Sequence, residues 1–297
     1  MENKGDFRYK IPTIENYPVL SPEGKPSSTI LQMMDVLELP NDRTLKNIVD
    51  ITQEKFFQKK SDGQRKERWE IAEVVPHLRE NVMPILDKLG MLKEFFPSEK
   101  KYDSALILGA LTPSVRKRLN YLGDLWENGI RFDKIVFLGG ERPLEPTKEN
   151  PEILLDRNNK ELLIGEDWQP PKEMPKTELE MMKILWDQAK LPRKMKQIQT
   201  EWINAPLKPN VTGTKFLRPT TEDSIKIWLE TKPAERKILA VSNNPHIGYQ
   251  ESVLKTYLPK DLNLETVGPA ASLKLPLAFY LGEMTRWLYQ EQIRLKK

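Results

Sequence analysis

The alternation of short apolar runs with helical segments in the last two thirds of the chain most constrains its fold. The runs at 104–109, 134–139, 197–203, 237–242 and 263–267 each have the length of a buried strand. The segments between them carry apolar residues three and four positions apart. Strands that alternate with helices form parallel sheets with right-handed crossovers. We therefore expect an α/β fold, a Rossmann-like, mainly parallel sheet with flanking helices, plus an N-terminal helical layer.

The first hundred residues lack this alternation. Residues 1–27 contain several prolines and no periodicity, which predicts an extended arm. The following segment, 28–100, has helical spacing, with helices expected from a cap at Ser28, after Asn41-Asp42, and across 69–89 with breaks or kinks at Pro76 and Pro84. We therefore divide the chain into the arm, a helical N-terminal region at 28–100 and an α/β domain at 101–297.

A long segment, 141–176, interrupts the strand–helix alternation. Within it, the apolar stretches 153–156 and 161–164 flank a polar Arg157–Lys160 turn. This pattern predicts a β-hairpin. A proline-rich stretch at 169–175 then precedes a helix predicted to start at Thr177.

Composition excludes several classes of function. The chain of 297 residues has 47 basic and 43 acidic residues, interleaved along its length, so we expect no nucleic-acid partner. It has no cysteine, which excludes disulfides, thiolate metal sites and cysteine nucleophiles. No apolar stretch approaches the ~20 residues of a membrane span, and the first residues lack a signal-peptide core. We expect a cytoplasmic protein. Export by a route that needs no N-terminal signal is the alternative.

The predicted helix starts carry the first indication of a site. Thr112-Pro113 and Asn244-Pro245 each pair a good N-cap with a good first helical residue, and Thr177–Glu180 and Thr220–Asp223 resemble capping boxes. In a parallel sheet these starts lie at the carboxyl edge of the strands. Free backbone N–H groups and helix dipoles there favour an anion, such as a phosphate, carboxylate or sulfate. The alternative is that every helix needs a cap and none of these has a function.

Glycines and arginines near the strand ends extend this prediction. Gly109, Gly139 and Gly140 either let a ligand approach the backbone or simply allow tight turns. Arg142 either holds an anion or forms a surface ion pair, and only one of Arg116 and Arg118 is expected to face the site. Arg218 is a further candidate. Neither a G-x-G-x-x-G fingerprint nor a phosphate-binding Walker motif is present.

His246, one of two histidines, follows the run at 237–242 directly. It is a candidate acid–base group, hydrogen-bond donor to an anion, or metal ligand. The competing interpretation is a structural histidine in a capping turn. Glu178 and Glu222 lie at helix starts and are the candidate carboxylates to act with it. Thr221, Asn243 and Asn244 are expected to bind ligand beside it. No histidine pair has metal-ligand spacing, so no metal is predicted.

These motifs, in this order, resemble the SanA/YdcF-like family of bacterial proteins of largely unknown function. The resemblance runs from about Asp103 to about Gly268, and this chain differs from the family pattern at Ala110, Asp223 and Tyr249, where the family has a glycine, an asparagine and a basic residue. The similar segments are Leu106–Ala110, Arg118-Leu119, Leu138–Gly140, Thr177–Met182, Thr220–Asp223, Ser242–Tyr249 and Glu265–Gly268.

The resemblance implies a Rossmann-like fold and a site for S-adenosylmethionine or another nucleotide-like ligand, and it links the chain to proteins of bacterial envelope processes. Two hypotheses follow. The first is an enzyme or ligand-binding protein whose polar cleft, at the carboxyl edge of the sheet, takes a small anionic or nucleotide-like molecule. The second is a non-catalytic sensor or interaction protein that acts on an envelope or host protein. A cleft without an aligned acid–base pair, together with an exposed apolar patch on the helical layer, would favour the second.

Overall fold

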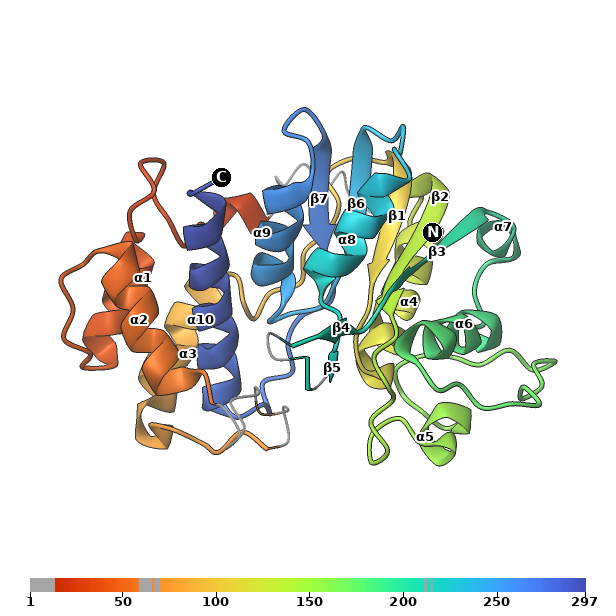
Figure 1. Cartoon of the computed structure of the whole chain (residues 1–297), viewed down its shortest axis with the longest axis horizontal. Coiled ribbons are helices and arrows are strands. Elements are labelled where there is room, and N and C mark those ends of the chain that lie inside the picture. The colour runs from red at the N-terminus through yellow and green to blue at the C-terminus, as the bar shows by residue number, and fades with distance from the viewer. Residues whose placement is uncertain (1–13, 59–65, 67–69, 211–212, 215) are drawn as a thin grey trace, which may run out of the picture.

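The computed structural model describes residues 14–58, 66, 70–210, 213–214 and 216–297. A five-stranded parallel sheet forms its centre, in the order β3-β2-β1-β6-β7 (Figure 1). Each predicted apolar run coincides with one of these strands, which confirms the α/β, Rossmann-like fold. The strands are β1 (Lys101–Leu108), β2 (Arg131–Gly140), β3 (Gln199–Ala205), β6 (Lys237–Val241) and β7 (Asn263–Val267).

Helices cover both faces of the sheet. Alternate residues of β1 illustrate this arrangement: Ala105 and Ile107 face one core, whereas Leu106 and Leu108 face the other. Burial on both faces explains why the central strands β1, β2 and β6 are continuous apolar runs, whereas the edge strands β3 and β7 contain polar residues. The first core is shared with α4 (Thr112–Glu127) and α6 (Glu178–Gln188), and the second with α8 (Thr221–Glu230) and α9 (Ile247–Tyr257).

The N-terminal helices pack against the last helix of the chain rather than directly on the sheet (Figure 1). Met33, Ile48 and Leu86 share a third core with Leu281 and Met284 of the last helix. This arrangement places the N-terminal and C-terminal segments on the same side of the sheet. The helices of this layer are α1 (Ser28–Val36), α2 (Leu45–Phe56), α3 (Arg79–Lys88), α10 (Leu277–Arg294) and the short 3-10 helices η1 (Ile14–Asn16) and η2 (Pro76–Leu78).

Local details of the N-terminal region differ from the expectations. Ser27, not Ser28, caps α1 by accepting a hydrogen bond from the N–H of Ile30. The third helical stretch begins only at Pro76, and Pro84 lies inside α3. Gly90, at φ +73°, follows the end of α3, a position that suits a residue without a Cβ. Residues 1–13 of the expected arm and Trp69 lie outside the described residues, whereas Ile14, Val19 and Leu20 are buried in the core of the helical layer.

The predicted hairpin within 141–176 is wrong. Its first arm is instead the helix α5 (Pro151–Leu155), and its second arm pairs only through Ile164, with Ala189. The reason is local: the Asn150 side chain accepts the N–H of Ile153, and Pro151 stands in the first turn, so the segment has a good helix start. Elements that the sequence did not predict are α7 (Arg193–Lys196) and the antiparallel pair β4 (Lys208–Pro209) and β5 (Phe216–Leu217).

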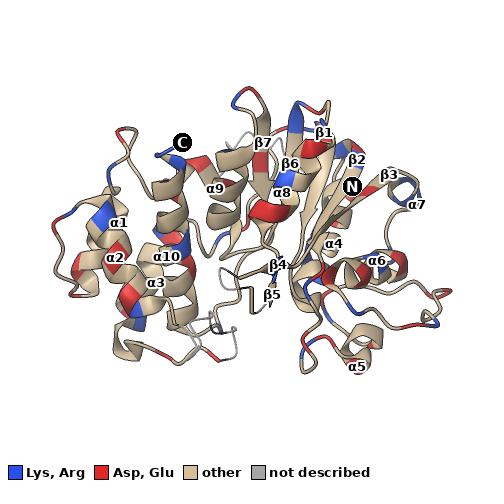
Figure 2. Cartoon of the chain, in the orientation of Figure 1, with Lys and Arg blue, Asp and Glu red and all other residues tan. Residues whose placement is uncertain are grey.

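Both signs of charge are spread over most of these elements. Figure 2 shows basic and acidic residues on most helices and loops, whereas the short helix α7 carries only basic charges, from Arg193, Lys194 and Lys196. Within the described ranges, no helix combines the length and apolar character that crossing a membrane requires.

Candidate functional site

A cavity of about 690 Å³ lies at the carboxyl ends of β1 and β6. The chain leaves β1 toward β2 and leaves β6 toward β7, so the strand order reverses between these two neighbours. Ligands of open α/β sheets bind at such a reversal point. One wall comes from the sheet edge and the starts of α4, α6, α8 and α9, and the opposite wall comes from α10 and α2. Its lining includes Gln53, Phe57, Gly109, Ser114, Arg118, Gly139, Arg142, Glu178, Arg218, Thr220, Thr221, Glu222, His246, Tyr249, Gln250, Phe279, Thr285, Arg286, Tyr289 and Gln290.

Arg118 joins the two strand ends beneath this cavity. Its side chain is buried, and its guanidinium donates to the carbonyl oxygens of Leu108 and Gly109, to Asn243 Oδ1 at 3.0 Å and to Gln250 Oε1 at 3.5 Å. All four acceptors are neutral, and no carboxylate of the described residues lies within ion-pair distance. Burial lowers the pKa of Arg118 to about 10, so the group stays charged at neutral pH. A cation thus lies at the reversal point without a contacting counter-ion.

Arg142, in contrast, is neutralised by two carboxylates. Its guanidinium makes a bidentate pair with Glu149 at 2.7 and 3.0 Å, and its Nε donates to Glu178 Oε1 at 3.3 Å. Burial by itself lowers the pKa of Arg142, but the hydrogen bonds and charges of both carboxylates outweigh burial and raise it. Burial also raises the pKa of Glu178, although the charge of Arg142 opposes this rise. The pair is buried rather than on the surface, and it fixes the start of the 141–176 segment.

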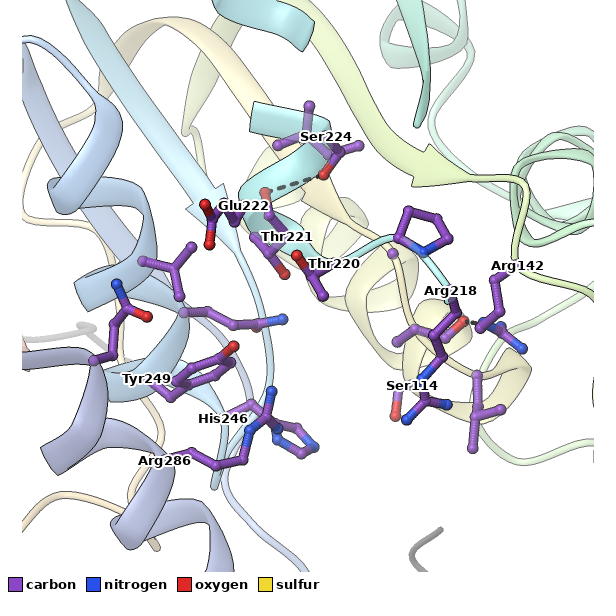
Figure 3. Close-up of a pocket in the computed structure, with 18 of the residues that line it drawn as sticks. Ser114, Arg142, Arg218, Thr220, Thr221, Glu222, Ser224, His246, Tyr249 and Arg286 are labelled. Atoms are coloured by element: carbon purple, nitrogen blue, oxygen red, sulfur yellow. Dashed lines mark hydrogen bonds between the residues drawn. The ribbon is translucent and has the colours of Figure 1, made fainter. Parts of the chain in front are cut away.

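His246 is held by a carboxylate from α10. Its Nδ1 lies 2.9 Å from Glu283 Oε2, and the Glu283 side chain is fully buried, whereas the His246 side chain is 19% exposed. Arg286 donates to both oxygens of Glu283 at 3.0 Å, and its guanidinium lies 3.8 Å from the centroid of the Tyr249 ring. Figure 3 shows Arg286 beside His246 and Tyr249, and Arg218 on the other side of the cavity with Ser114 and Arg142.

Two of the four predicted helix caps are confirmed. Thr177 and Glu180 form a capping box on α6, and Thr220 and Asp223 form one on α8. The other two are wrong. α4 begins at Thr112 itself, with Leu111 before it, because Pro113 occupies the second helical position. The bond between Asn244 and Pro245 is cis, and α9 begins only at Ile247.

Nine of the sequence-predicted site residues line this one cavity: Gly109, Arg118, Gly139, Arg142, Glu178, Arg218, Thr221, Glu222 and His246. Neither predicted carboxylate is bonded to the histidine, because Glu178 is paired with Arg142 and Glu222 with Lys226.

The other four predicted residues do not line the cavity and have contacts that explain their burial. Thr112 donates its backbone N–H to Glu149, and Asn243 accepts from Arg118. Asn244 donates its side-chain amide to the carbonyl oxygens of Gly90 and Lys93, which ties the β6 end to the helical region. A Cβ at Gly140 would lie 2.4 Å from Pro219 Cγ and 2.8 Å from the carbonyl oxygen of Ala205, so this glycine permits close packing.

Glu283, Arg286 and Glu149 are the important residues that sequence reasoning missed. Glu283 lies four residues after Phe279 and three after Tyr280, on the apolar stripe of a helix. An acidic residue on such a stripe must be paired or solvated, which is a usable signal. Its partner, however, is 37 positions away in sequence. No cluster of three or more metal-ligating carboxylate or imidazole side chains occurs among the residues that the structure describes.

Comparison with known proteins gives no relative for this arrangement: no family model, no curated protein and no solved structure matches the chain.

Proposed function

We propose that the cavity at the β1 and β6 ends binds a small anionic or nucleotide-like molecule and that the protein acts on it as an enzyme. The observation that carries the proposal is Arg118. A buried guanidinium with five N–H donors makes four hydrogen bonds, all to neutral acceptors of the described residues, and it lines the cavity. Since a buried charge is costly unless it is paired, an anionic ligand is the natural counter-ion.

The size of the cavity fits the proposal, since sites for drug-sized ligands have volumes of roughly 300–1,000 Å³. The starts of α6 and α8 also lie at the cavity, and Thr220 and Thr221 belong to its lining. Their first turns already hold carboxylates of the chain, Glu178 and Glu180 on α6 and Glu222 and Asp223 on α8, so these helix starts give no separate support for an anion.

The resemblance to the SanA/YdcF-like family remains a proposal as well. The family pattern has a basic residue where this chain has Tyr249. Here a guanidinium lies against the Tyr249 ring, supplied by Arg286 of α10. Positive charge at this corner of the cavity therefore comes from a helix outside the segment that resembles the family. Because Arg286 stands where the family pattern supplies a basic residue, S-adenosylmethionine, which carries a carboxylate, is among the ligands to be tested.

The acid–base pair of His246 and Glu283 favours an enzyme over the alternative of a sensor or interaction protein. Of the described residues, the exposed large apolar side chains are Phe96, Leu163, Phe216, Leu217, Leu273, Tyr289 and Leu295. None of these belongs to α1, α2 or α3. In their described parts, α1, α2 and α3 therefore lack the exposed apolar patch that a docking surface would need, although Tyr289 of α10 and Leu295 after it are exposed.

Calorimetric titration of the full chain with inorganic phosphate, pyrophosphate, AMP, ADP and S-adenosylmethionine tests the proposal. Ser114 lines the cavity in the first turn of α4. The variant Ser114→Asp adds a carboxylate where a helix tolerates it, so it should fold normally and repel an anion. We expect Ser114→Asp to weaken binding by roughly tenfold or more, about 1.4 kcal/mol, and the uncharged Ser114→Asn to bind as the wild type does. No binding of any of these compounds, or equal binding by Ser114→Asp, would refute the proposal.

A further inference from the structure

The tautomer of His246 follows from its buried partner. Glu283 is fully buried and receives two hydrogen bonds from Arg286, which keeps its carboxylate charged. A charged carboxylate only accepts hydrogen bonds, so the His246 Nδ1 that faces it carries the proton. The other ring nitrogen, Nε2, then has a free lone pair. His246 belongs to the cavity lining, and Phe279 packs edge-on against its ring at 5.7 Å between centroids.

The charges around the ring favour its neutral form. Burial lowers the pKa of His246, the charge and hydrogen bond of Glu283 oppose this, and the guanidinium groups of Arg118 and Arg286 add to the lowering. These three groups come from α10 and α4, and Tyr249 of α9 lies under Arg286. The result is an imidazole that is unprotonated at neutral pH, oriented by a carboxylate, and next to cations. A general base must be unprotonated at the working pH, and it is most efficient when its pKa lies near that pH.

We propose that His246 is the general base of a hydrolytic reaction on a phosphate ester bound in the cavity, with Glu283 as its positioning residue. This inference rests on the proposed function, because it takes the bound anion to be the substrate. Arg118, Arg218 and Arg286 all line the same cavity, and guanidinium groups suit the oxygens of a phosphoryl group.

The proposed step balances without any further reactant. Nε2 of His246 takes a proton from a water molecule, whose oxygen forms a bond to phosphorus while the bond from phosphorus to the ester oxygen breaks. The leaving oxygen, on the opposite side of phosphorus, takes a proton from solvent water, and Nε2 releases its proton to solvent, which restores the neutral imidazole. The products are an alcohol and inorganic phosphate from a monoester, or an alcohol and a phosphate monoester from a diester. Glu283 stabilises the imidazolium that forms during the step, and Arg286 holds Glu283 in place.

Hydrolysis of p-nitrophenyl phosphate and bis(p-nitrophenyl) phosphate by the full chain tests the proposal, with p-nitrophenyl acetate as the carboxyl-ester comparison. We expect turnover of at least one phosphate ester, and a loss of kcat by about 100-fold or more in His246→Gln with phosphate binding retained. Glu283→Gln should lower kcat and move the acidic limb of the pH profile to lower pH, because the group that raises the pKa of His246 is lost.

Two control variants match these changes. Glu291→Gln removes a carboxylate from the same helix, where it is paired with Arg294 three residues away as Glu283 is with Arg286, and His77→Gln removes the other histidine. Both should leave kcat unchanged. No cleavage of either phosphate ester, or full activity of His246→Gln, would overturn this inference, while calorimetry with phosphate or nucleotides would still decide the proposed function separately.

A further measurement needs no substrate and leaves His246 and Glu283 unchanged. With two histidines in the chain, ¹⁵N-labelled imidazole signals can be assigned by comparison with His77→Gln. We expect His246 to carry its proton on Nδ1 at pH 7 and to titrate below 6.5. A proton on Nε2, or a protonated ring at pH 7, would refute the assignment of His246 as a base.

Discussion

Glu149 offers the sharpest test of how this site is held together. Its side chain is fully buried and each oxygen accepts two hydrogen bonds. Oε1 receives the N–H of Thr112 at 3.2 Å and Arg142 Nη2 at 3.0 Å, and Oε2 receives Arg142 Nη1 at 2.7 Å and the N–H of Glu145 at 2.9 Å. One carboxylate therefore joins the start of α4, the 141–176 segment and the cavity arginine.

The variant Glu149→Gln keeps the shape of the side chain but cannot keep these bonds. Whichever way the amide is turned, its NH₂ group faces two donors, one from Arg142 and one from the backbone. Both lost bonds end on a charged carboxylate in the wild type, and each such bond contributes about 1.5–3 kcal/mol, so together they contribute about 3–6 kcal/mol. Glu178 still pairs with Arg142, so we expect a destabilisation at the lower end of this range, about 3–4 kcal/mol.

Equilibrium urea unfolding followed by tryptophan fluorescence measures this change, since the chain has seven tryptophans. Glu166→Gln is the matched control, because Glu166 lies in the same segment but its ion pair with Lys190 is exposed. The urea midpoint of this variant should equal that of the wild type. Removing both partners, in Glu149→Leu with Arg142→Met, should cost less than the sum of the single changes. A loss below about 1 kcal/mol for Glu149→Gln would refute the reasoning.

Two further changes test local packing and capping. Gly140→Ala should lower the free energy of unfolding by about 1–3 kcal/mol, because its Cβ would meet Pro219 and a backbone oxygen. The control Gly165→Ala, whose Cβ would have its nearest atom at 3.7 Å, should have little effect. Urea unfolding compares the two variants, and equal midpoints would contradict the packing role of Gly140. Thr177→Ala removes the α6 cap and should lower the free energy of unfolding by about 0.5–2 kcal/mol, whereas Thr177→Ser should retain most of the stability. An unchanged urea midpoint for Thr177→Ala would show that the cap is dispensable.

Much of the α/β domain was predictable because its signals are local. The central strands β1, β2 and β6 are buried on both faces, so each contains a continuous apolar run that stands out from its polar loops. The boxes at Thr177 and Thr220 were equally visible, because a cap involves residues only three positions apart. The same local rules failed at 153–164, where the first arm of the predicted hairpin is the five-residue helix α5. They also failed at Thr112, which is the first residue of α4 and not its N-cap.

The candidate site was predicted only in part. Parallel strands bring their carboxyl ends together whatever their order, which is why Gly109, Gly139, Glu178 and His246 line one cavity. Nothing in the sequence indicates that β1 and β6 are neighbours, and this adjacency brings Asn243 and Gln250 within reach of Arg118, which faces the cavity. Arg116 instead donates to the carbonyl oxygens of Ile153 and Leu154.

The sequence by itself determined the elements and the edge of the sheet at which they meet, because periodicity, capping and strand composition act over a few residues. The tertiary structure alone decided the partner of His246. The N-terminal helices pack on α10, and α10 then presents Glu283 and Arg286 to a loop that precedes them by more than thirty residues. Such a contact depends on how the N-terminal helices and α10 share one core, and no spacing of residues along the chain encodes it.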